Sequence, residues 1–168
     1  MVEFKYNILS RITMDDIKQK AHYVAVTGII RKDGKYLICK RSPNEKAFPN
    51  KWCVPGGKIE LSDMNAIPKI SDTHWSNVFE NILQKEILEE TKLKIKNIGY
   101  VANVAFIRPN GFSTLVISLH ADHESGEVEL NKEELTDHAW VSVDELKDYD
   151  LINNIDEQII KVDKMYKK

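Results

Sequence analysis

The first half of the chain has the hydrophobic pattern of β-strands joined by tight turns. The pattern is strand-like over 22–30, and Asp33-Gly34 is a dipeptide typical of a hairpin turn. Residues 36–39 form the expected return strand. After a polar loop, a short apolar strand at 52–54 stops at Pro55-Gly56-Gly57, because a proline followed by two glycines forces the backbone to turn. We therefore expect a hairpin, then a short strand that leads into a sharp turn.

Between Ser71 and Leu93 the apolar period becomes helical. Five apolar residues recur there at steps of three and four positions: Trp75, Val78, Phe79, Ile82 and Leu83. Ser71, Asp72 or Thr73 is available as the N-cap. The pattern predicts one long central helix.

The remaining chain returns to strands and ends in helices. The expected elements are strands over 100–107, 112–121 and 138–143, a hairpin turn at 108–111, and helices near 143–148 and 155–166. Strands in hairpins with one central and one late helix indicate an α/β protein with a mixed β-sheet. A doubly wound parallel sheet is not expected.

Residues 1–21 stand apart from this pattern. A short stretch of alternating apolar residues is followed there by a capped helical turn that begins at Thr13. We expect an N-terminal extension over 1–21, available for a contact in a homodimer, and one main domain over 22–168.

The composition is that of a globular protein. With 168 residues, of which 42% are hydrophobic and 30% charged, the chain is long enough for one domain without disulfides or a structural metal. Its apolar runs are much shorter than the ~20 residues that a membrane helix needs, and its start does not resemble a secretory signal. We expect a cytoplasmic protein with no membrane partner.

The charge balance further limits the kinds of partner that the protein is expected to bind. Twenty-four Lys and Arg stand against 26 Asp and Glu, which gives a net charge of -2. A surface that binds a nucleic acid backbone is therefore not expected, and phosphate contacts must be local. Cys39 and Cys53 have no Cys-x-x-Cys spacing, so we interpret them as small apolar strand residues and not as a zinc or redox site.

Three glutamates continue the apolar stripe of the central helix, where buried residues are expected. At 100° per residue the stripe reaches Glu86, Glu89 and Glu90. Their side chains can approach one point, where like charges repel unless a cation neutralises them. Clustered carboxylates suit Mg²⁺ or Mn²⁺ better than zinc. The alternative is that the stripe ends at Leu83 and the acids form a solvated face.

A longer motif surrounds these acids. Pro55-Gly56-Gly57-Lys58-Ile59-Glu60 followed by Glu86-Ile87-Leu88-Glu89-Glu90 resembles the signature of the Nudix hydrolases, Gly-x5-Glu-x7-Arg-Glu-U-x-Glu-Glu-x-Gly-U, in which U is aliphatic. Gly57 takes the first position of the signature and Leu93 takes the last. The order of the strands from about His22 also resembles the family.

The chain departs from that signature in four ways. The acid expected six residues after Gly57 is Asp63, Lys85 stands where arginine is usual, and Lys92 replaces the second glycine. Gly57 and Lys85 are 28 positions apart where the signature has 14, so 14 extra residues lie between the turn and the helix. If they precede the acid, its position falls on Asn77. Because lysine lacks the planar fork of arginine, we expect a looser arrangement of the glutamates.

The resemblance implies a fold, a reaction and a metal. The implied fold is an α/β/α sandwich, and the implied reaction is hydrolysis of the diphosphate linkage in a nucleoside diphosphate joined to another group, a small-molecule substrate. Glu86, Glu89 and Glu90, with the backbone carbonyl of Gly57, are the implied ligands of Mg²⁺, with Mn²⁺ as an alternative.

A general base is also required. The resemblance favours Glu134, because some family members place an acid in the corresponding loop, here 131–135, six residues before Trp140. Glu89 and Glu133 are the alternatives. A solvated loop explains the acids at 133 and 134 equally well.

Three further residues are candidates for substrate binding. Arg41 lies at the end of the second hairpin strand and Lys58 beside the glycine turn, so both are candidate phosphate contacts. Phe48, in the loop before Trp52, is a candidate for stacking on a base, although a loop aromatic is also a common packing residue.

Two other functions fit the same sequence. A catalytically weak Nudix-like domain that binds or senses a nucleotide is consistent with the departures at Lys85 and Lys92. An interaction module that uses residues 61–74 as a docking loop is the other possibility.

Overall fold

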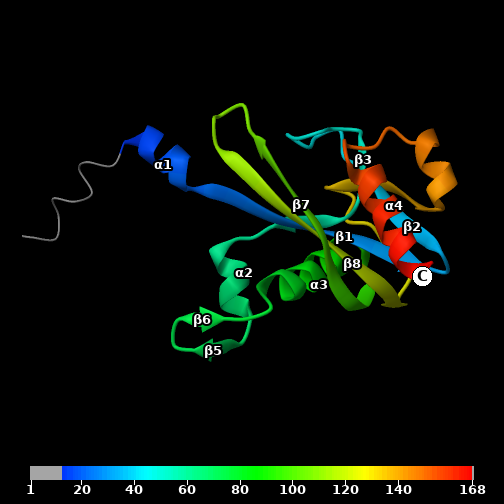
Figure 1. Ribbon diagram of the computed structural model, residues 1–168, viewed down its shortest axis with the longest axis horizontal. Coiled ribbons are helices and arrows are strands. Elements are labelled where there is room, and N and C mark those ends of the chain that lie inside the picture. Colours follow the sequence, from blue (N-terminus) through cyan, green and yellow to red (C-terminus); the bar gives the residue numbers. More distant parts are fainter. Residues whose placement is uncertain (1–12, 168) are drawn as a thin grey trace, which may run out of the picture.

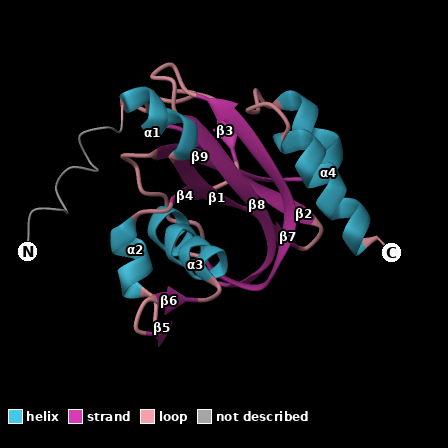
Figure 2. Cartoon of the chain, turned by 60° about the vertical axis from the view of Figure 1, so that its left-hand side comes forward, coloured by secondary structure: helices cyan, strands magenta, loops and turns pink. Residues whose placement is uncertain are grey.

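The computed structural model describes residues 13–167 and has a β-sheet with helices on both faces (Figures 1 and 2). In chain order the elements are α1 (Met14–Lys20), β1 (His22–Lys32), β2 (Lys35–Arg41), β3 (Trp52–Cys53), β4 (Gly56–Lys58), α2 (Leu61–Ala66), β5 (Lys69–Ser71), β6 (His74–Trp75), α3 (Val78–Thr91), β7 (Lys94–Ile107), β8 (Ser113–Ser125), β9 (Leu135–Val141), the 3₁₀-helix η2 (Val143–Asp148) and α4 (Ile155–Tyr166). The alternating apolar stretch expected before Thr13 lies outside the described residues.

The main sheet has seven strands and is mixed. Its central order is β3-β2-β1-β8-β7, with β4 paired to β1 and β9 paired to β2. β1 runs parallel to β8, whereas β7 and β8 are antiparallel, as are β1 and β2. The mixed sheet predicted from the sequence is therefore confirmed.

The sheet separates two apolar cores, one under α3 and one under α4 (Figure 2). Alternate residues of β1 serve the two cores, because successive side chains of a strand point to opposite faces: Val26 and Ile30 belong to the α3 core and Ile29 to the α4 core. A Cβ on Gly28 would lie 2.9 Å from Leu83, so α3 lies close against β1. This layering is the expected α/β/α sandwich, and it fixes α3 on the sheet.

The first hairpin forms where the sequence predicts it. Asp33 and Gly34 both have positive φ, 51° and 76°, as a two-residue hairpin turn requires. Lys32 pairs with Lys35 across the turn. The helical turn near the N-terminus is also confirmed, because the Thr13 hydroxyl accepts a hydrogen bond from the Asp16 N–H in a capping box.

The central helix is shorter than its apolar period suggests. α3 begins at Val78 and not near Ser71, so the expected N-caps at 71–73 are wrong. Asn77 precedes the helix in a left-handed conformation with φ 52°. Trp75 belongs to β6, and Phe79 is 39% exposed. Val78 is partly buried and packs against the core that contains Ile82, so the buried stripe starts at Val78, whereas Trp75 and Phe79 match its period without belonging to it.

The extra residues between the glycine turn and α3 form a small unit of their own. α2 is followed by the hairpin of β5 and β6, which is a two-stranded sheet separate from the main one (Figure 1). Lys69 pairs with Trp75 in this hairpin, and its ammonium lies 5.0 Å from the centre of the indole ring. The hairpin replaces the helical turns predicted for 71–77.

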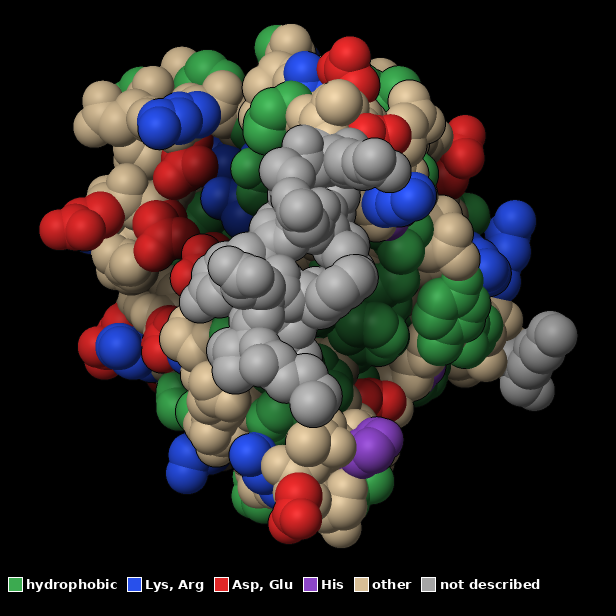
Figure 3. Space-filling view, turned by 90° about the vertical axis from the view of Figure 1, so that its left-hand side faces the viewer, with side chains coloured by type: hydrophobic (Ala, Val, Ile, Leu, Met, Phe, Trp, Pro, Cys, Tyr) green, Lys and Arg blue, Asp and Glu red, His purple; other side chains and the backbone are tan. Residues whose placement is uncertain are grey.

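Apolar side chains gather at the end of the molecule that Figure 3 shows. Tyr23 on β1 packs edge-on against Phe112 with ring centres 5.9 Å apart, and Phe48 packs in the same way against Phe106 on β7 at 6.3 Å. These side chains lie beyond the part of the sheet that α4 covers. Within residues 13–167, no helix combines the length and the apolar composition needed to cross a membrane.

Candidate active site

The glycine turn at 56–57 brings β4 against both β1 and α3. A Cβ on Gly56, whose φ is 149°, would lie 2.2 Å from the carbonyl oxygen of Val26. A Cβ on Gly57 would lie 2.0 Å from a carboxylate oxygen of Glu86. Two glycines are therefore required for different reasons: the first lets β4 pair with β1, and the second lets the Glu86 carboxylate rest on the backbone.

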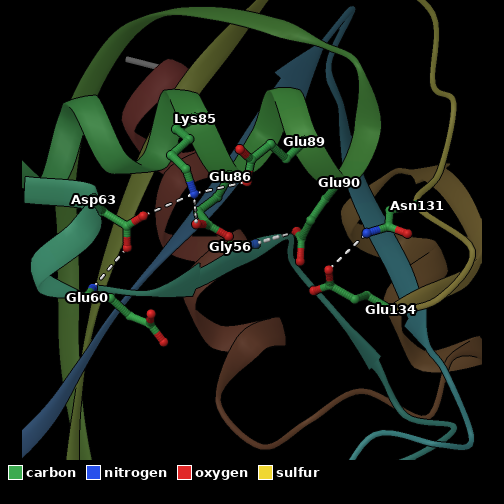
Figure 4. A network of polar contacts seen from close by, with 9 residues as sticks. All are labelled: Gly56, Glu60, Asp63, Lys85, Glu86, Glu89, Glu90, Asn131 and Glu134. Carbon is green, nitrogen blue, oxygen red and sulfur yellow. Dashed lines mark hydrogen bonds and ion pairs between the residues drawn. The ribbon is translucent and has the colours of Figure 1, made fainter. Parts of the chain in front are cut away.

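The three predicted glutamates all lie on α3, but they differ in burial. Glu90 is 6% exposed, the Glu86 side chain is 14% exposed, and the Glu89 side chain is 57% exposed. Figure 4 shows that they come from successive turns of the helix and lie beside the glycine turn. The predicted acidic stripe is therefore buried at two positions, whereas Glu89 lies at its rim.

Glu90 forms no ion pair within the described part of the chain, in contrast to Glu86 and Glu89. The backbone N–H of Gly56 donates a hydrogen bond of 2.8 Å to its carboxylate. Burial raises the pKa of Glu90 to about 8; the Gly56 hydrogen bond and the charge of Arg41 oppose this shift, and the nearby charges of Glu134 and Glu86 add to it. A buried carboxylate with one donor has unused acceptor capacity, so this position is suited to hold a proton or a cation.

Lys85 lies among three carboxylates. Its ammonium is 3.2 Å from Asp63, 3.2 Å from Glu86 and 3.0 Å from Glu89 (Figure 4). Partial desolvation works against the charged lysine, but hydrogen bonds to the three acids outweigh it and raise the pKa of Lys85. The pKa of Glu86 is nevertheless raised, because burial outweighs the effect of Lys85.

The contact with Lys85 distinguishes the two candidate positions for the signature acid. Asp63 reaches Lys85 with one carboxylate oxygen and accepts a hydrogen bond of 2.9 Å from the Glu60 N–H with the other. Asn77 instead precedes α3 as its N-cap residue, and its carbonyl accepts a hydrogen bond from the Asn81 side chain. The extra residues therefore follow Asp63 in the chain.

Glu134 is positioned by a segment that is held against the C-terminus of α3 by backbone hydrogen bonds. The N–H of Asn131 donates to the carbonyl of Glu90 at 2.9 Å, and the N–H of Glu129 donates to the carbonyl of Thr91 at 3.0 Å. These bonds satisfy carbonyls at the C-terminus of α3. The Asn131 amide also donates to the Glu134 carboxylate at 2.9 Å.

Asn131, Glu129 and Thr91 are thus residues that sequence reasoning missed. The signal for Asn131 was its spacing, since an asparagine three residues before an acid is typical of a local turn in which the amide bonds its neighbours. Glu133, the neighbouring candidate base, donates only its backbone N–H, to the Asn131 side chain, and its carboxylate has no hydrogen-bond partner within the described part of the chain.

The candidate substrate contacts are spread over two sides of the site. Lys58 is exposed on β4, directly after the glycine turn. Arg41 holds the loop that follows β2, because it donates to the carbonyl of Ala47 at 2.8 Å and pairs with Glu45 at 2.5 Å. Phe48, in that loop, is 45% exposed and contacts Phe106.

The donors at this site fit a divalent cation that prefers oxygen. The candidate ligands are carboxylates and a backbone carbonyl, and the missing side chain of Gly57 leaves the space in which the Glu86 carboxylate lies. Over residues 13–167, no three acidic, imidazole or thiol side chains already converge on one point at coordination distance. Glu86 and Glu89 instead face Lys85, so binding a cation requires them to exchange contacts with the ammonium for contacts with the metal.

Comparison with known proteins places this arrangement in a family. A profile of the NUDIX domain matches residues 20–162. Over 67 residues the chain is 39% identical to the NAD-capped RNA hydrolase NudC of Mannheimia succiniciproducens, which covers 40% of this chain and 24% of that protein. The chain thus spans about a quarter of that relative. It is 28% identical over 137 residues to the nucleoside triphosphatase NudI of Klebsiella pneumoniae, covering 75% of this chain and 86% of NudI.

Solved structures share the fold. The MutT NUDIX hydrolase from Burkholderia pseudomallei is 21% identical, with a TM-score of 0.67 over 85% of this chain and 99% of that one. The NUDIX domain of Shewanella oneidensis NrtR, complexed with ADP ribose, is 16% identical, with a TM-score of 0.67 over 99% of both chains. Since the family profile extends over most of the sequence and the fold agrees, the chain belongs to the Nudix hydrolase family.

Proposed function

We propose that the protein is a divalent-metal-dependent pyrophosphohydrolase that cleaves the diphosphate linkage of a nucleoside di- or triphosphate derivative. The observation that carries the proposal is the grouping of Gly57, Glu86, Glu89 and Glu90 beside Glu134. A diphosphate is strongly anionic, so such a cluster of acids can act on it only through cations. The protein's relatives include a nucleoside triphosphatase and its structural neighbours a UDP-X diphosphatase, and both activities belong to this reaction class.

Mg²⁺, or Mn²⁺ in its place, is the proposed cofactor, held by Glu86, Glu89, Glu90 and the carbonyl of Gly57. When bound, the metal neutralises the diphosphate oxygens and lowers the pKa of the attacking water. The chain contributes carboxylates on one rigid helix and a glycine turn against which Glu86 lies. These elements keep the ligands at fixed positions relative to the substrate.

Glu134 is the proposed general base. Its Oε1 accepts a hydrogen bond from Asn131, which leaves Oε2 to take the proton of the water that attacks phosphorus. As the new P–O bond forms, the bond to the bridging oxygen breaks, and the two phosphate-bearing products separate. Glu89 is the alternative base, because it too is exposed to solvent at the rim of the site.

Arg41, Lys58 and Phe48 are the proposed substrate contacts. Lys58 is exposed beside the glycine turn and is available to a phosphate. Arg41 uses two of its nitrogens to hold the loop that carries Phe48, so it orders that loop as well as supplying charge. Phe48 and Phe106 present exposed ring surface on which a base can stack.

The reaction can be tested with a substrate panel. The purified protein would be assayed with Mg²⁺ against nucleoside triphosphates, oxidised nucleotides, ADP-ribose, NAD, dinucleoside polyphosphates and nucleotide sugars. We expect turnover of at least one substrate and its loss on removal of divalent ions. Cleavage of another kind of bond, with every phosphoanhydride bond of the substrate left intact, would contradict the proposal.

The assignment of the base can be tested with a matched pair of variants. Glu134→Gln should lower kcat by about 10² to 10⁴ with little change in KM, because it removes the proton acceptor but not the binding contacts. Glu133→Gln removes the same charge from the same loop and should leave kcat within about twofold of the wild type. Equal effects of the two changes would move the assignment to Glu89.

A nucleotide-binding domain without turnover is the second candidate. It is favoured by the Lys85 ion pairs, which already offset part of the charge of Glu86 and Glu89 without a metal, and by the fold shared with a NUDIX domain that binds ADP ribose. Calorimetry with ADP-ribose separates the two functions. Binding that is equally tight with Mg²⁺ and with a chelator, in the absence of hydrolysis, would support the second candidate.

A further inference from the structure

A groove of about 430 Å³ lies beside the C-terminal end of α3. Its lining residues are Glu89, Lys92, Glu129, Leu130, Asn131 and Glu134. Two of them, Glu89 and Glu134, are the acids proposed above for the reaction. The groove is therefore continuous with the candidate active site, and Lys92 is the cationic residue among those that line it.

The backbone at Lys92 is in a conformation that suits glycine. Lys92 ends α3 with φ 61° and ψ 10°, and its N–H donates to the carbonyl of Leu88 at 3.1 Å. An L-residue with a long side chain is disfavoured in this left-handed region, where glycine or asparagine is the usual helix terminator. The Nudix signature has glycine at this position. The lysine side chain thus opposes the local backbone preference.

The backbone here is held by packing and not by the lysine side chain. Gly126, at the end of β8, lies so close that a Cβ on it would be 2.8 Å from the Lys92 carbonyl oxygen. Glu129 donates its N–H to the neighbouring carbonyl of Thr91. Side-chain removal at position 92 should therefore leave this turn intact.

The ammonium of Lys92 is free to bind a ligand. Lys85 forms three ion pairs with acids of the site, whereas Lys92 forms none within 4.0 Å in the part of the chain that the structure describes. The other charged residues of the groove are carboxylates, which repel a phosphate. An unpaired cation among them is the local group that an anionic end of a substrate would contact.

We propose that Lys92 is a specificity-determining residue, whose ammonium binds a terminal phosphate of the substrate. This inference rests on the proposed function and deepens it. A nucleoside triphosphate ends in a dianionic phosphate that can accept a charge-assisted hydrogen bond from Lys92. A nucleotide sugar ends in an uncharged ring and gains nothing from the same contact. The protein therefore prefers substrates with a free terminal phosphate.

The test compares two substrates that share their base, UTP with UDP-glucose or GTP with GDP-mannose, whichever pair the wild type hydrolyses. Lys92→Gln should raise the KM of the triphosphate about tenfold, in keeping with the loss of one charged hydrogen bond. Its kcat, and both constants for the nucleotide sugar, should stay within about twofold. Lys92→Arg should restore the KM. Lys94→Gln, which removes an exposed charge two residues away and outside the groove, is the matched control.

A second measurement separates binding from a structural role. Lys92→Gly should raise the melting temperature, because it relieves the left-handed conformation, while it raises the KM of the triphosphate as the glutamine does. A fall in melting temperature, or a KM that rises equally for both substrates, would overturn the inference alone. Absence of turnover of every nucleotide by the wild type would overturn the proposed function, and this inference with it.

Discussion

The two ends of the acidic row on α3 balance their charge by different means. At one end, Lys85 contacts Asp63, Glu86 and Glu89, so a cation built into the chain offsets part of their negative charge. At the other end, Glu90 is buried against Gly56 with Glu134 nearby. Its raised pKa favours the protonated carboxyl group, so a proton removes the charge that a cation would otherwise balance. We call these the Lys85 cluster and the Glu90 pocket.

The difference shows where the site depends on an added cation. In the Lys85 cluster the gain from a bound metal is reduced by the ion pairs that it replaces. In the Glu90 pocket this loss is smaller, because among the described residues the carboxylate has one hydrogen-bond donor and forms no ion pair. We therefore expect changes in the Glu90 pocket to have larger effects on catalysis than changes in the Lys85 cluster.

The largest expected effect is that of Glu90→Gln. The amide keeps the size of the side chain and can still accept the Gly56 hydrogen bond, but it cannot supply negative charge. Turnover should fall roughly 10³-fold, the scale of a lost electrostatic contact in a water-excluded site, with the fold intact. Steady-state rates measure the loss of turnover, and circular dichroism checks that the fold is intact. Glu80→Gln, in the first turn of the same helix, is the control, and an equal loss there would mean that the row acts only through total charge.

A smaller loss is expected from Gly57→Ala, which acts on the Lys85 cluster. The added Cβ would lie 2.0 Å from the Glu86 carboxylate, so that side chain must move away from the turn. A displaced ligand should cost roughly 10 to 100-fold in metal affinity or activity. Titration of turnover with Mg²⁺ measures it. The expectation fails if the variant needs no more Mg²⁺ than the wild type and turns over as fast.

The two regions should also differ in how stability depends on pH. The pKa of Glu90 is raised to about 8 in the folded protein, above its ordinary value of 4.5. Between these values the folded chain keeps a proton that the unfolded chain has released, so stability falls as the pH rises from about 4.5 to 8. The raised pKa of Glu86 acts in the same direction.

Thermal melting in a chelator at pH 5 and pH 8 measures this slope. Glu90→Gln cannot titrate, so its melting temperature should fall less between the two pH values than that of the wild type. The change Glu80→Gln, in the first turn of the same helix, should leave the slope as it is. Parallel curves for the wild type and Glu90→Gln would show that Glu90 is not the group responsible.

The smallest effect is expected from Lys85→Arg. A guanidinium can bond two carboxylates through its planar fork, so Glu86 and Glu89 should be better fixed and the Mg²⁺ requirement should fall by a few-fold. Lys85→Met removes the ion pairs that a bound metal must replace, so a requirement that rises in this variant would show that bracing of the glutamates outweighs this competition. Turnover against Mg²⁺ concentration compares the three proteins. If the arginine variant turns over no faster than the wild type at any Mg²⁺ concentration, Lys85 is not a weaker substitute for the arginine of the Nudix signature.

The sequence predicted the parts of this site that are local in the chain. The glycine turn and the spacing of Glu86, Glu89 and Glu90 are short motifs, and helix geometry alone brings the acids together. The start of α3 was wrong because Trp75 continues the helical period by coincidence, while the hairpin of β5 and β6 satisfies its own hydrogen bonds.

The contacts between distant segments of the chain could not be predicted from the sequence pattern. The bonds from Asn131 and Glu129 to the end of α3 join segments about 40 residues apart, and no periodicity encodes them. The ion pair between Asp63 and Lys85 could not be predicted, because the spacing did not decide whether the 14 extra residues lie before or after the signature acid. That acid could therefore be Asp63 or its position could fall on Asn77. Only packing decides such questions.

The parallel pairing of β1 with β8 sets the order in which the protein can fold. His22–Arg31 aligns with Ser113–Asp122, so each contact closes a loop of 91 residues. Topologies dominated by such distant pairings fold slowly. During synthesis at about 5 to 20 residues per second, roughly 5 to 20 seconds pass between the synthesis of β1 and that of β8, and the apolar side chains of β1 have no partner strand during this time. The protein that emerges first is thus a hairpin and a helix without a sheet to cover, and this interval is when it most needs protection from aggregation.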